Sequence, residues 1–226
     1  MITVHHLDAS RSHRVLWLLE ELELPYELVR YERDRKTLRA PRSLRLVHPL
    51  GKAPVVVDDG NTLAESGAII EYLVGRYGNG RLAPTDARER QRYLYWLHYA
   101  EGSLMPWLLL KLVTTRLAKP PVPALVRPLT KLVARGLEQQ VVHPELALHI
   151  GYISDQLGKT GWFAGDAFTA ADIQMSFPVE LAIQRGAGSA PTERLAAFLE
   201  RIQRRPAYQR AEQRGGALRL SRRERV

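Results

Sequence analysis

The chain has 226 residues, of which 45% are hydrophobic and 25% are charged, and its formal net charge is +9. These fractions are typical of a globular protein and exclude a disordered or fibrous chain. The sequence contains no cysteine, which excludes disulfides, thiolate metal sites and a cysteine nucleophile.

Short strand and helix patterns alternate at the start of the chain. Apolar spacing predicts a strand over residues 2–7 and a helix whose apolar residues run over 15–22. Pro25 ends that helix, because the residue before a proline is pushed out of the helical region. A second strand is predicted over residues 26–31.

A basic, irregular connection over residues 33–45 leads to a second group of elements. Residues 54–57 predict a third strand, and the turn signal at 58–61 predicts a tight connection to a short fourth strand at 62–63. A helix then opens at Glu65. This order of elements predicts a compact α/β unit.

A stretch rich in glycine and proline over residues 78–84 marks a domain boundary. It separates a predicted α/β domain over residues 1–80 from a predicted all-helical domain over 86–214. Two long and three shorter helices are expected in the second domain. The long ones cover 87–116, with a bend near Pro106, and the stretch after the proline-rich residues 119–123 through 157, with kinks at Pro128 and Pro144; the shorter ones lie near 170–184, 192–204 and 207–213.

The positive charge is concentrated at the C-terminal end. Residues 201–226 hold nine arginines and two glutamates, and residues 215–226 are predicted to form a solvated basic tail. A nucleic-acid partner is not expected, because Tyr208 is the only aromatic residue among these arginines. A membrane partner is not expected either, since the longest apolar run, 104–110, is too short to span a bilayer. Without a secretory signal pattern, a cytoplasmic location is predicted.

Three short segments carry a recognisable pattern. They read Gly-Lys-Ala-Pro-Val-Val at 51–56, Leu-Ala-Glu-Ser-Gly-Ala-Ile at 63–69, and Phe-Ala-Gly-Asp with Thr-Ala-Ala-Asp-Ile at 163–166 and 169–173. In these segments and their order the chain resembles the cytosolic glutathione transferase family. The resemblance implies a thioredoxin-like N-terminal domain, an all-α C-terminal domain, glutathione as co-substrate and a homodimer.

Glu65 and Ser66 stand at the predicted start of a helix. Such a start presents unpaired backbone N–H groups and a partial positive charge, which suit a carboxylate. Ser66 adds a hydroxyl and Glu65 an acceptor for an ammonium group, so the pair matches the γ-glutamyl end of glutathione. The alternative is that Ser66 only caps the helix.

The segment before the third strand is the second candidate element for binding glutathione. The resemblance implies that the peptide bond before Pro54 is cis and that the backbone of Ala53 pairs with the cysteinyl part of glutathione. The alternative is an ordinary trans turn that opens an edge strand. Lys52 and His48 are the residues expected to meet the glycine carboxylate.

The catalytic group must stabilise a thiolate, because a free thiol has a pKa of about 8.5. In the family this group lies between the first strand and the first helix. No tyrosine occurs between Met1 and Tyr26, so the chain is similar to serine-type relatives, such as the bacterial theta, zeta and beta classes. Ser10 is the candidate, with Ser12 as the alternate. A third possibility is that Ser10 only caps the helix and that backbone N–H groups or Arg11 hold the thiolate.

The electrophile is expected along the first long helix. Tyr99, Met105 and His98 are the candidate pocket residues, although an aromatic and methionine stripe at helical spacing is also typical of a core. Glu101 is a further candidate, for contact with the glutathione of a partner subunit.

Two other site types are rejected. Asp8, Ser10 and His13 have the residue types of a hydrolytic triad, but no Gly-x-Ser-x-Gly motif accompanies them. His5 and His6 lie on a strand, where adjacent side chains point to opposite faces, so no metal site is predicted.

Thr169 and Asp172 have the spacing of a capping box at a helix start. The threonine accepts from a backbone N–H while the acid reaches back to the start of the helix. A structural role is therefore predicted for Asp172.

The predicted function is a glutathione transferase that activates the thiolate for attack on a hydrophobic electrophile or an organic hydroperoxide. The alternative is a non-catalytic module of the same fold that binds a ligand or a protein. Thiol-disulfide exchange through a protein cysteine is excluded, since the chain has none.

Overall fold

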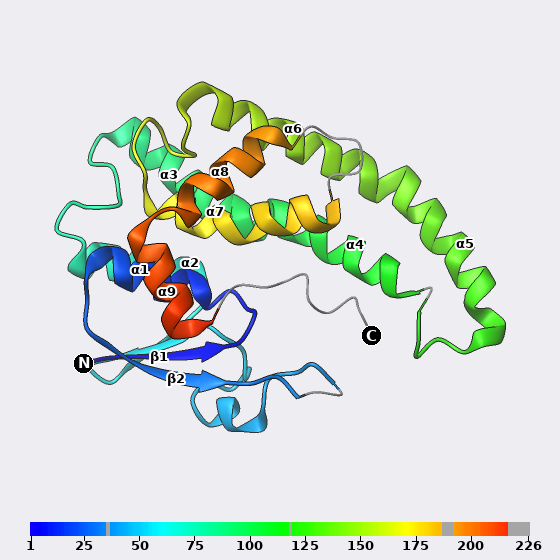
Figure 1. Ribbon diagram of the computed structural model, residues 1–226, viewed down its shortest axis with the longest axis horizontal. Helices are drawn as coiled ribbons and strands as arrows, with labels where there is room; N and C mark the ends of the chain where they lie inside the picture. Colours follow the sequence, from blue (N-terminus) through cyan, green and yellow to red (C-terminus); the bar gives the residue numbers. More distant parts are fainter. Residues whose placement is uncertain (35–36, 118, 187–191, 217–226) are drawn as a thin grey trace.

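The computed structural model describes residues 1–34, 37–117, 119–186 and 192–216. A sheet with two α-helices forms the N-terminal part, and helices form the remainder of the described chain (Figure 1). This confirms the predicted thioredoxin-like α/β unit followed by an all-α region. The domain limits at residues 80 and 86 stay a prediction, and residues 217–226 of the predicted basic tail lie outside the described residues.

Four strands form the sheet: β1 (Ile2–Leu7), β2 (Tyr26–Tyr31), β3 (Val55–Asp58) and β4 (Asn61–Ala64), in the order β2-β1-β3-β4. β1 and β2 are parallel, with Ile2 opposite Tyr26, because the intervening helix returns the chain to the same end of the sheet. β3 is antiparallel to both β1 and β4. The carboxyl end of β1 therefore leads directly into the loop that carries the candidate serines.

The helices agree closely with the sequence pattern. The N-terminal part contains α1 (His13–Leu22), the 3₁₀ turn η1 (Arg42–Leu46) and α2 (Ser66–Tyr77). The remainder contains α3 (Ala87–Tyr99), α4 (Met105–Leu117), the 3₁₀ turn η3 (Ala124–Val126), α5 (Arg127–Leu137), α6 (His143–Thr160), α7 (Ala170–Leu181), α8 (Glu193–Gln203) and α9 (Pro206–Gly215).

π-helical turns occur next to the prolines of the long helices. In the turn η2 (Ala100–Leu104) the N–H of Met105 donates to the carbonyl of Ala100, five residues earlier, just before Pro106. The turn η4 (Glu138–Val142) likewise precedes Pro144, and η5 (Ala182–Gly186) extends α7. The kink expected at Pro128 is wrong, because this proline lies in the first turn of α5, where a missing N–H leaves no bond unmade.

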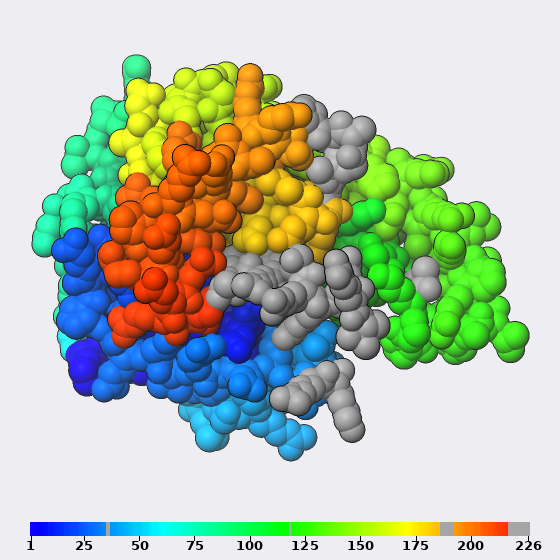
Figure 2. Space-filling model, in the orientation of Figure 1, coloured from blue at the N-terminus to red at the C-terminus, as the bar shows by residue number. Residues whose placement is uncertain are grey.

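The last helix of the described chain, α9, packs against α1, and its surface borders that of the N-terminal part (Figure 2). Arg205, the N-cap residue of α9, forms a bidentate pair with Glu21, at 2.6 and 2.8 Å. Arg210 and Arg214 both contact the carboxylate of Glu20, at 2.9 and 3.2 Å. Much of the basic charge in the described C-terminal region is thus committed to ion pairs with the N-terminal unit.

Asp172 forms the predicted capping box at the start of α7. Its carboxylate accepts from the backbone N–H groups of Phe163 and Thr169, both at 2.8 Å, and from the hydroxyl of Thr169 at 3.1 Å. The side chain is fully buried. Asp172 thus joins the loop before α7 to the helix start, which agrees with a structural role.

His13 opens α1 in a buried position and makes stability depend on pH. Its ring packs edge-on against Tyr208 of α9, with 5.0 Å between centroids, and Nε2 has no hydrogen-bond partner among the described residues. Burial, with a smaller contribution from His6, lowers the pKa of His13 to about 3. The folded protein therefore holds His13 neutral, whereas the unfolded chain takes up a proton below pH 6.5.

Through His13 alone, we expect the free energy of unfolding to fall by about 2 kcal/mol between pH 6.5 and pH 5. The folded pKa is depressed, so the stabilisation is present above the unfolded pKa and is lost on acidification. Asp172 and Glu180, whose pKa values burial raises to about 6 and about 7, act in the opposite direction. Urea unfolding of the unmodified protein and of His13→Phe at pH 7 and pH 5 measures this change as a difference between the two proteins, because the titrations of Asp172 and Glu180 are common to both. His13→Phe keeps an aromatic ring beside Tyr208 and should show a smaller fall; an unchanged fall would contradict the role of His13.

Candidate functional site

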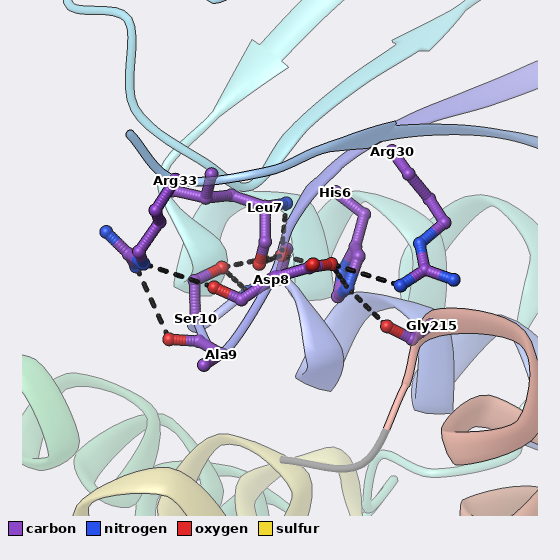
Figure 3. Close-up of polar contacts among 9 residues, drawn as sticks. His6, Leu7, Asp8, Ala9, Ser10, Arg30, Arg33 and Gly215 are labelled. Atoms are coloured by element: carbon purple, nitrogen blue, oxygen red, sulfur yellow. Dashed lines mark hydrogen bonds and ion pairs between the residues drawn. The ribbon is translucent and has the colours of Figure 1, made fainter. Parts of the chain in front are cut away.

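The loop between β1 and α1 brings the two candidate serines together (Figure 3). The hydroxyl oxygens of Ser10 and Ser12 are 2.7 Å apart, and the oxygen of Ser12 is 2.8 Å from Nδ1 of His6. The N–H of Leu7 donates to the oxygen of Ser12 at 3.2 Å. Both serines are buried, with 6% of Ser10 and none of Ser12 exposed.

Ser10 does not cap α1. Its hydroxyl oxygen accepts from the N–H of Ser12 at 3.2 Å, within the loop, and the helix begins after Ser12. Ser12, the N-cap residue, makes no side-chain bond to the first turn. The hydroxyl of Ser10 is therefore not occupied by a bond to the helix.

A cavity of about 930 Å³ opens beside this loop. Its wall contains Ser10 together with Lys52 and Ala53, and it is strongly basic. We call it the basic cavity, because Arg39, Arg42 and Arg45 also line it. One described acid, Asp34, lines the same cavity. The charge balance of the wall favours an anionic ligand.

The first residues of α2 lie next to a buried arginine of α1. Arg14 is fully buried, and its guanidinium donates to the hydroxyl of Ser66 at 2.8 Å, to Glu101 at 2.7 Å and to the carbonyl of Gln174 at 2.8 Å. Burial lowers the pKa of Arg14 to about 10, and Glu101 opposes this change. Arg14 thus ties the start of α2 to the helical domain.

Glu101 interacts with arginines of its own chain. It accepts from Arg11 at 3.0 Å as well as from Arg14. Burial raises the pKa of Glu101, but the two guanidiniums outweigh burial and hold it below its usual value. The expected contact with a partner subunit's glutathione stays a prediction. Sequence reasoning missed Arg14 altogether, because a charged residue beside an apolar helix stripe gives no signal of burial.

Glu65 has an unusual backbone conformation. Its φ of 68° lies in the left-handed region, which is rare for a residue with a side chain. The side chain is exposed, and the carbonyl accepts from the N–H of Ile69 at 2.9 Å. Such conformations cluster at functional sites. The carboxylate of Glu65 itself faces solvent in this conformation, so it is accessible to a ligand.

The segment before β3 agrees with the sequence prediction in its geometry. The Ala53–Pro54 peptide bond is cis. Lys52 is exposed on the wall of the basic cavity, whereas His48, Glu65 and Ser66 are not among the described residues that line it. The carbonyl of His48 accepts from Gly51 at 2.8 Å. The structure thus brings Ser10, Lys52 and Ala53 together and leaves His48 outside.

The predicted electrophile residues lie elsewhere. Tyr99 packs in an aromatic cluster between α3 and α6, where its hydroxyl bonds to His149. Met105 belongs to the core and His98 is exposed. None of these three is among the described residues that line the basic cavity. Tyr99 and Met105 are instead buried in the core.

Phe177 of α7 is the aromatic residue on the cavity wall that sequence reasoning missed. Its ring lies under the guanidiniums of Arg11 and Arg14, at 5.3 and 5.4 Å from the centroid. No sequence pattern marks this residue, because α7 is buried on nearly all sides. Among the described residues there is no group of three or more His, Asp or Glu side chains placed to hold a metal ion, and none of the helices has the length and apolar content of a membrane span.

Comparison with known proteins shows the family and the fold of the chain. Residues 1–75 match the family model of the glutathione S-transferase N-terminal domain. Glutathione S-transferase 3 of Schizosaccharomyces pombe is 38% identical over 208 residues, 92% of this chain and 85% of that protein. Glutathione S-transferase 1 of Saccharomyces cerevisiae is 35% identical and covers 82% of both chains. A solved glutathione S-transferase of Actinobacillus pleuropneumoniae is 34% identical with a TM-score of 0.78, covering 98% of this chain and 96% of that one.

Proposed function

Because the chain belongs to the glutathione S-transferase family, we propose that it binds glutathione in the basic cavity and activates the thiol for attack on an apolar electrophile. The observation that carries this proposal is the place of Ser10, which lines the same cavity as Lys52 and Ala53. A hydroxyl at this position is suited to donate to a thiolate at the end of β1. Ser12 is the alternate donor.

The remaining contacts of glutathione follow from its charges. Its γ-glutamyl carboxylate suits the N-terminus of α2 and the hydroxyl of Ser66, and its ammonium suits Glu65. Because neither residue lines the basic cavity, this end of glutathione is proposed to extend beyond the cavity. The backbone of Ala53 is proposed to pair with the cysteinyl part. Lys52 is proposed to meet the glycine carboxylate; His48 stays a prediction for the same group.

The electrophile is proposed to contact Phe177 in place of Tyr99, Met105 and His98. An aromatic wall beside Ser10 favours a carbon electrophile with an apolar body over a small polar one. An organic hydroperoxide is the second candidate class of substrate. No observation on the described residues favours the non-catalytic alternative.

The decisive experiment is an ultraviolet titration of the glutathione thiolate bound to the protein. We expect the bound thiol to titrate about 2 pKa units below its free value of ~8.5, and Ser10→Ala to remove about 1–2 units of that shift. The kcat/KM at pH 7 should fall roughly 10–100-fold, since one charge-assisted hydrogen bond is lost. Ser154→Ala, at a buried serine of α6 that is not on the cavity wall, is the matched control.

The other outcomes are informative. A shift that survives in Ser10→Ala would move the catalytic role to Ser12 or to backbone donors. Binding of glutathione without any shift in the unmodified protein would favour the non-catalytic module.

A homodimer is also proposed, in which α4 and α5 supply apolar contacts. These helices extend away from the remainder of the described molecule (Figure 1). Leu109 and Val113 of α4 are 57% and 47% exposed, and Leu129 and Leu132 of α5 are 64% and 68% exposed. Apolar side chains gathered in this way are typical of an interface. Sedimentation velocity of Leu129→Lys, which should shift toward monomer, tests the role of α5.

A cytoplasmic location stays a prediction.

A further inference from the structure

His6 belongs to a hydrogen-bonded row that starts at Ser10 and ends at Gly215 (Figure 3). The row runs from the hydroxyl of Ser10 to that of Ser12 at 2.7 Å, then to Nδ1 of His6 at 2.8 Å. Nε2 of His6 continues it to the backbone carbonyl of Gly215 at 2.9 Å. Residues that are 209 positions apart are thus joined within the buried part of the molecule.

The partners of His6 fix the position of its proton. The carbonyl of Gly215 can only accept, and the carboxylate of Asp8, 3.9 Å from Nε2, also accepts; Nε2 therefore carries the hydrogen. His6 is 1% exposed, and burial lowers its pKa, which keeps the imidazole neutral near pH 7. The positive group near it is Arg30, which is paired with Asp8 at 3.2 Å; the neighbouring His13 is neutral, because burial lowers its pKa to about 3. A neutral imidazole that donates through Nε2 must accept at Nδ1.

The direction of the hydrogen bonds made by the two serines follows from the position of the proton on His6. Ser12 donates its hydroxyl hydrogen to Nδ1, and its oxygen accepts from the N–H of Leu7. The oxygen of Ser12 can then accept from Ser10 but not donate to it. The hydroxyl hydrogen of Ser10 is left with two acceptors, the oxygen of Ser12 and any anion in the cavity. A thiolate is the stronger acceptor, so rotation of the Ser10 hydroxyl hydrogen lets Ser10 donate to the sulfur instead of to Ser12.

We propose that His6, held by the carbonyl of Gly215, is a positioning residue that acts on the glutathione thiolate through Ser12 and Ser10. Without the acceptor at Nδ1, the hydroxyl of Ser12 turns to the carbonyl of Leu7, 3.3 Å away, or to Ser10 itself. The oxygen of Ser10 then keeps only the backbone N–H of Ser12, at 3.2 Å, as a fixed partner. This inference rests on the proposed function of Ser10.

Gly215 is suited to its place in this row. A side chain added there would collide with Leu16 of α1 and would lie 3.3 Å from Nε2 of His6. Glycine therefore allows the end of α9 to approach β1 closely. The end of α9 is thereby connected through His6 to the loop between β1 and α1 that carries Ser10 and Ser12.

Two substitutions of His6 separate its two hydrogen bonds. His6→Asn places a carbonyl oxygen where Nδ1 stood and keeps the acceptor for Ser12, but it cannot reach Gly215. His6→Gln places an amide near Nε2 and keeps the donor to Gly215, but it loses the acceptor for Ser12. The titration of bound glutathione thiol is the measurement, with glutathione KM and kcat determined in parallel.

We expect His6→Gln to raise the pKa of the bound thiol by about 0.5–1 unit and to lower kcat at pH 7 roughly 3–10-fold. Glutathione KM should change less than about twofold, since the binding groups are untouched. His6→Asn should stay close to the unmodified protein. Ser12→Ala should reproduce the effect of His6→Gln and serves if the histidine variants do not fold. His5→Gln, at the adjacent histidine that bonds to Tyr31 on the other face, is the matched control.

Equal thiol shifts in His6→Gln and the unmodified protein would overturn the inference, as would equal losses in His6→Gln and His6→Asn. The double variant Ser10→Ala/His6→Gln should titrate like Ser10→Ala alone, because without the Ser10 hydroxyl the hydrogen-bonded row no longer reaches the thiolate. If Ser10→Ala leaves the shift intact, the proposed role of Ser10 fails. If Ser10→Ala removes the shift but His6→Gln does not, only the role of His6 fails.

Discussion

Replacing Arg14 with methionine is expected to destabilise the protein by about 3–5 kcal/mol, the loss typical of removing one partner of a buried ion pair. Arg14 is fully buried and donates to three acceptors from three different parts of the chain. Methionine fills much of the space of the arginine stem but supplies no donor. The hydroxyl of Ser66 and the carbonyl of Gln174 would be left without this partner, and Glu101 would retain Arg11 alone.

Urea unfolding measures this loss, and glutathione KM measures its effect on the site. The KM should rise, because Arg14 holds Ser66 at the place proposed for the γ-glutamyl carboxylate. Arg14→Lys should fall between the two proteins, since one ammonium cannot satisfy a carboxylate, a hydroxyl and a carbonyl in the planar arrangement of a guanidinium. Arg88→Met, at an exposed arginine in the first turn of α3, should change stability by less than about 0.5 kcal/mol. A similarly small change in Arg14→Met would show that water replaces all three bonds.

The elements of the fold were predictable from local patterns. The strand at Ile2–Leu7, the turn before β4 and the capping box at Thr169 each depend on a few adjacent residues, and such signals survive in a single sequence. Prolines were read less well. Pro128 begins α5 instead of kinking a helix. A proline without a backbone N–H is compatible with the first turn of a helix and also with a kink inside one, so only the tertiary context selects between the two.

The candidate site was predictable only where it is local. Ser10, Lys52 and Ala53 follow from short motifs, and one cavity contains all three. His6 and Phe177 could not be found in this way. His6 looked like one of two adjacent strand histidines, and its role depends on Gly215, which lies at the other end of the described chain. Phe177 is one apolar residue in a helix that is buried on nearly all sides, and only packing decides which side of α7 faces the cavity.

Asp172→Ala is expected to lower the free energy of unfolding by about 3 kcal/mol at pH 7, because it leaves two buried backbone N–H groups, those of Phe163 and Thr169, without an acceptor. The glutathione KM should change little, since Asp172 does not line the basic cavity. Asp166→Ala, at an exposed acid of the same segment, is the matched control. An unchanged melting temperature would contradict the structural role.

The effect of this substitution should also depend on pH. Burial raises the pKa of Asp172 to about 6, even though its three hydrogen bonds act in the opposite direction. The folded protein therefore binds a proton between pH 3.8 and pH 6 that the unfolded chain releases, and stability from this group falls as the pH rises through that window. The loss in Asp172→Ala should consequently be about 1 kcal/mol larger at pH 5 than at pH 7. The histidine titrations are common to both proteins and cancel in this difference, so an equal loss at the two pH values would mean that Asp172 is ionised throughout and that its hydrogen bonds outweigh its burial.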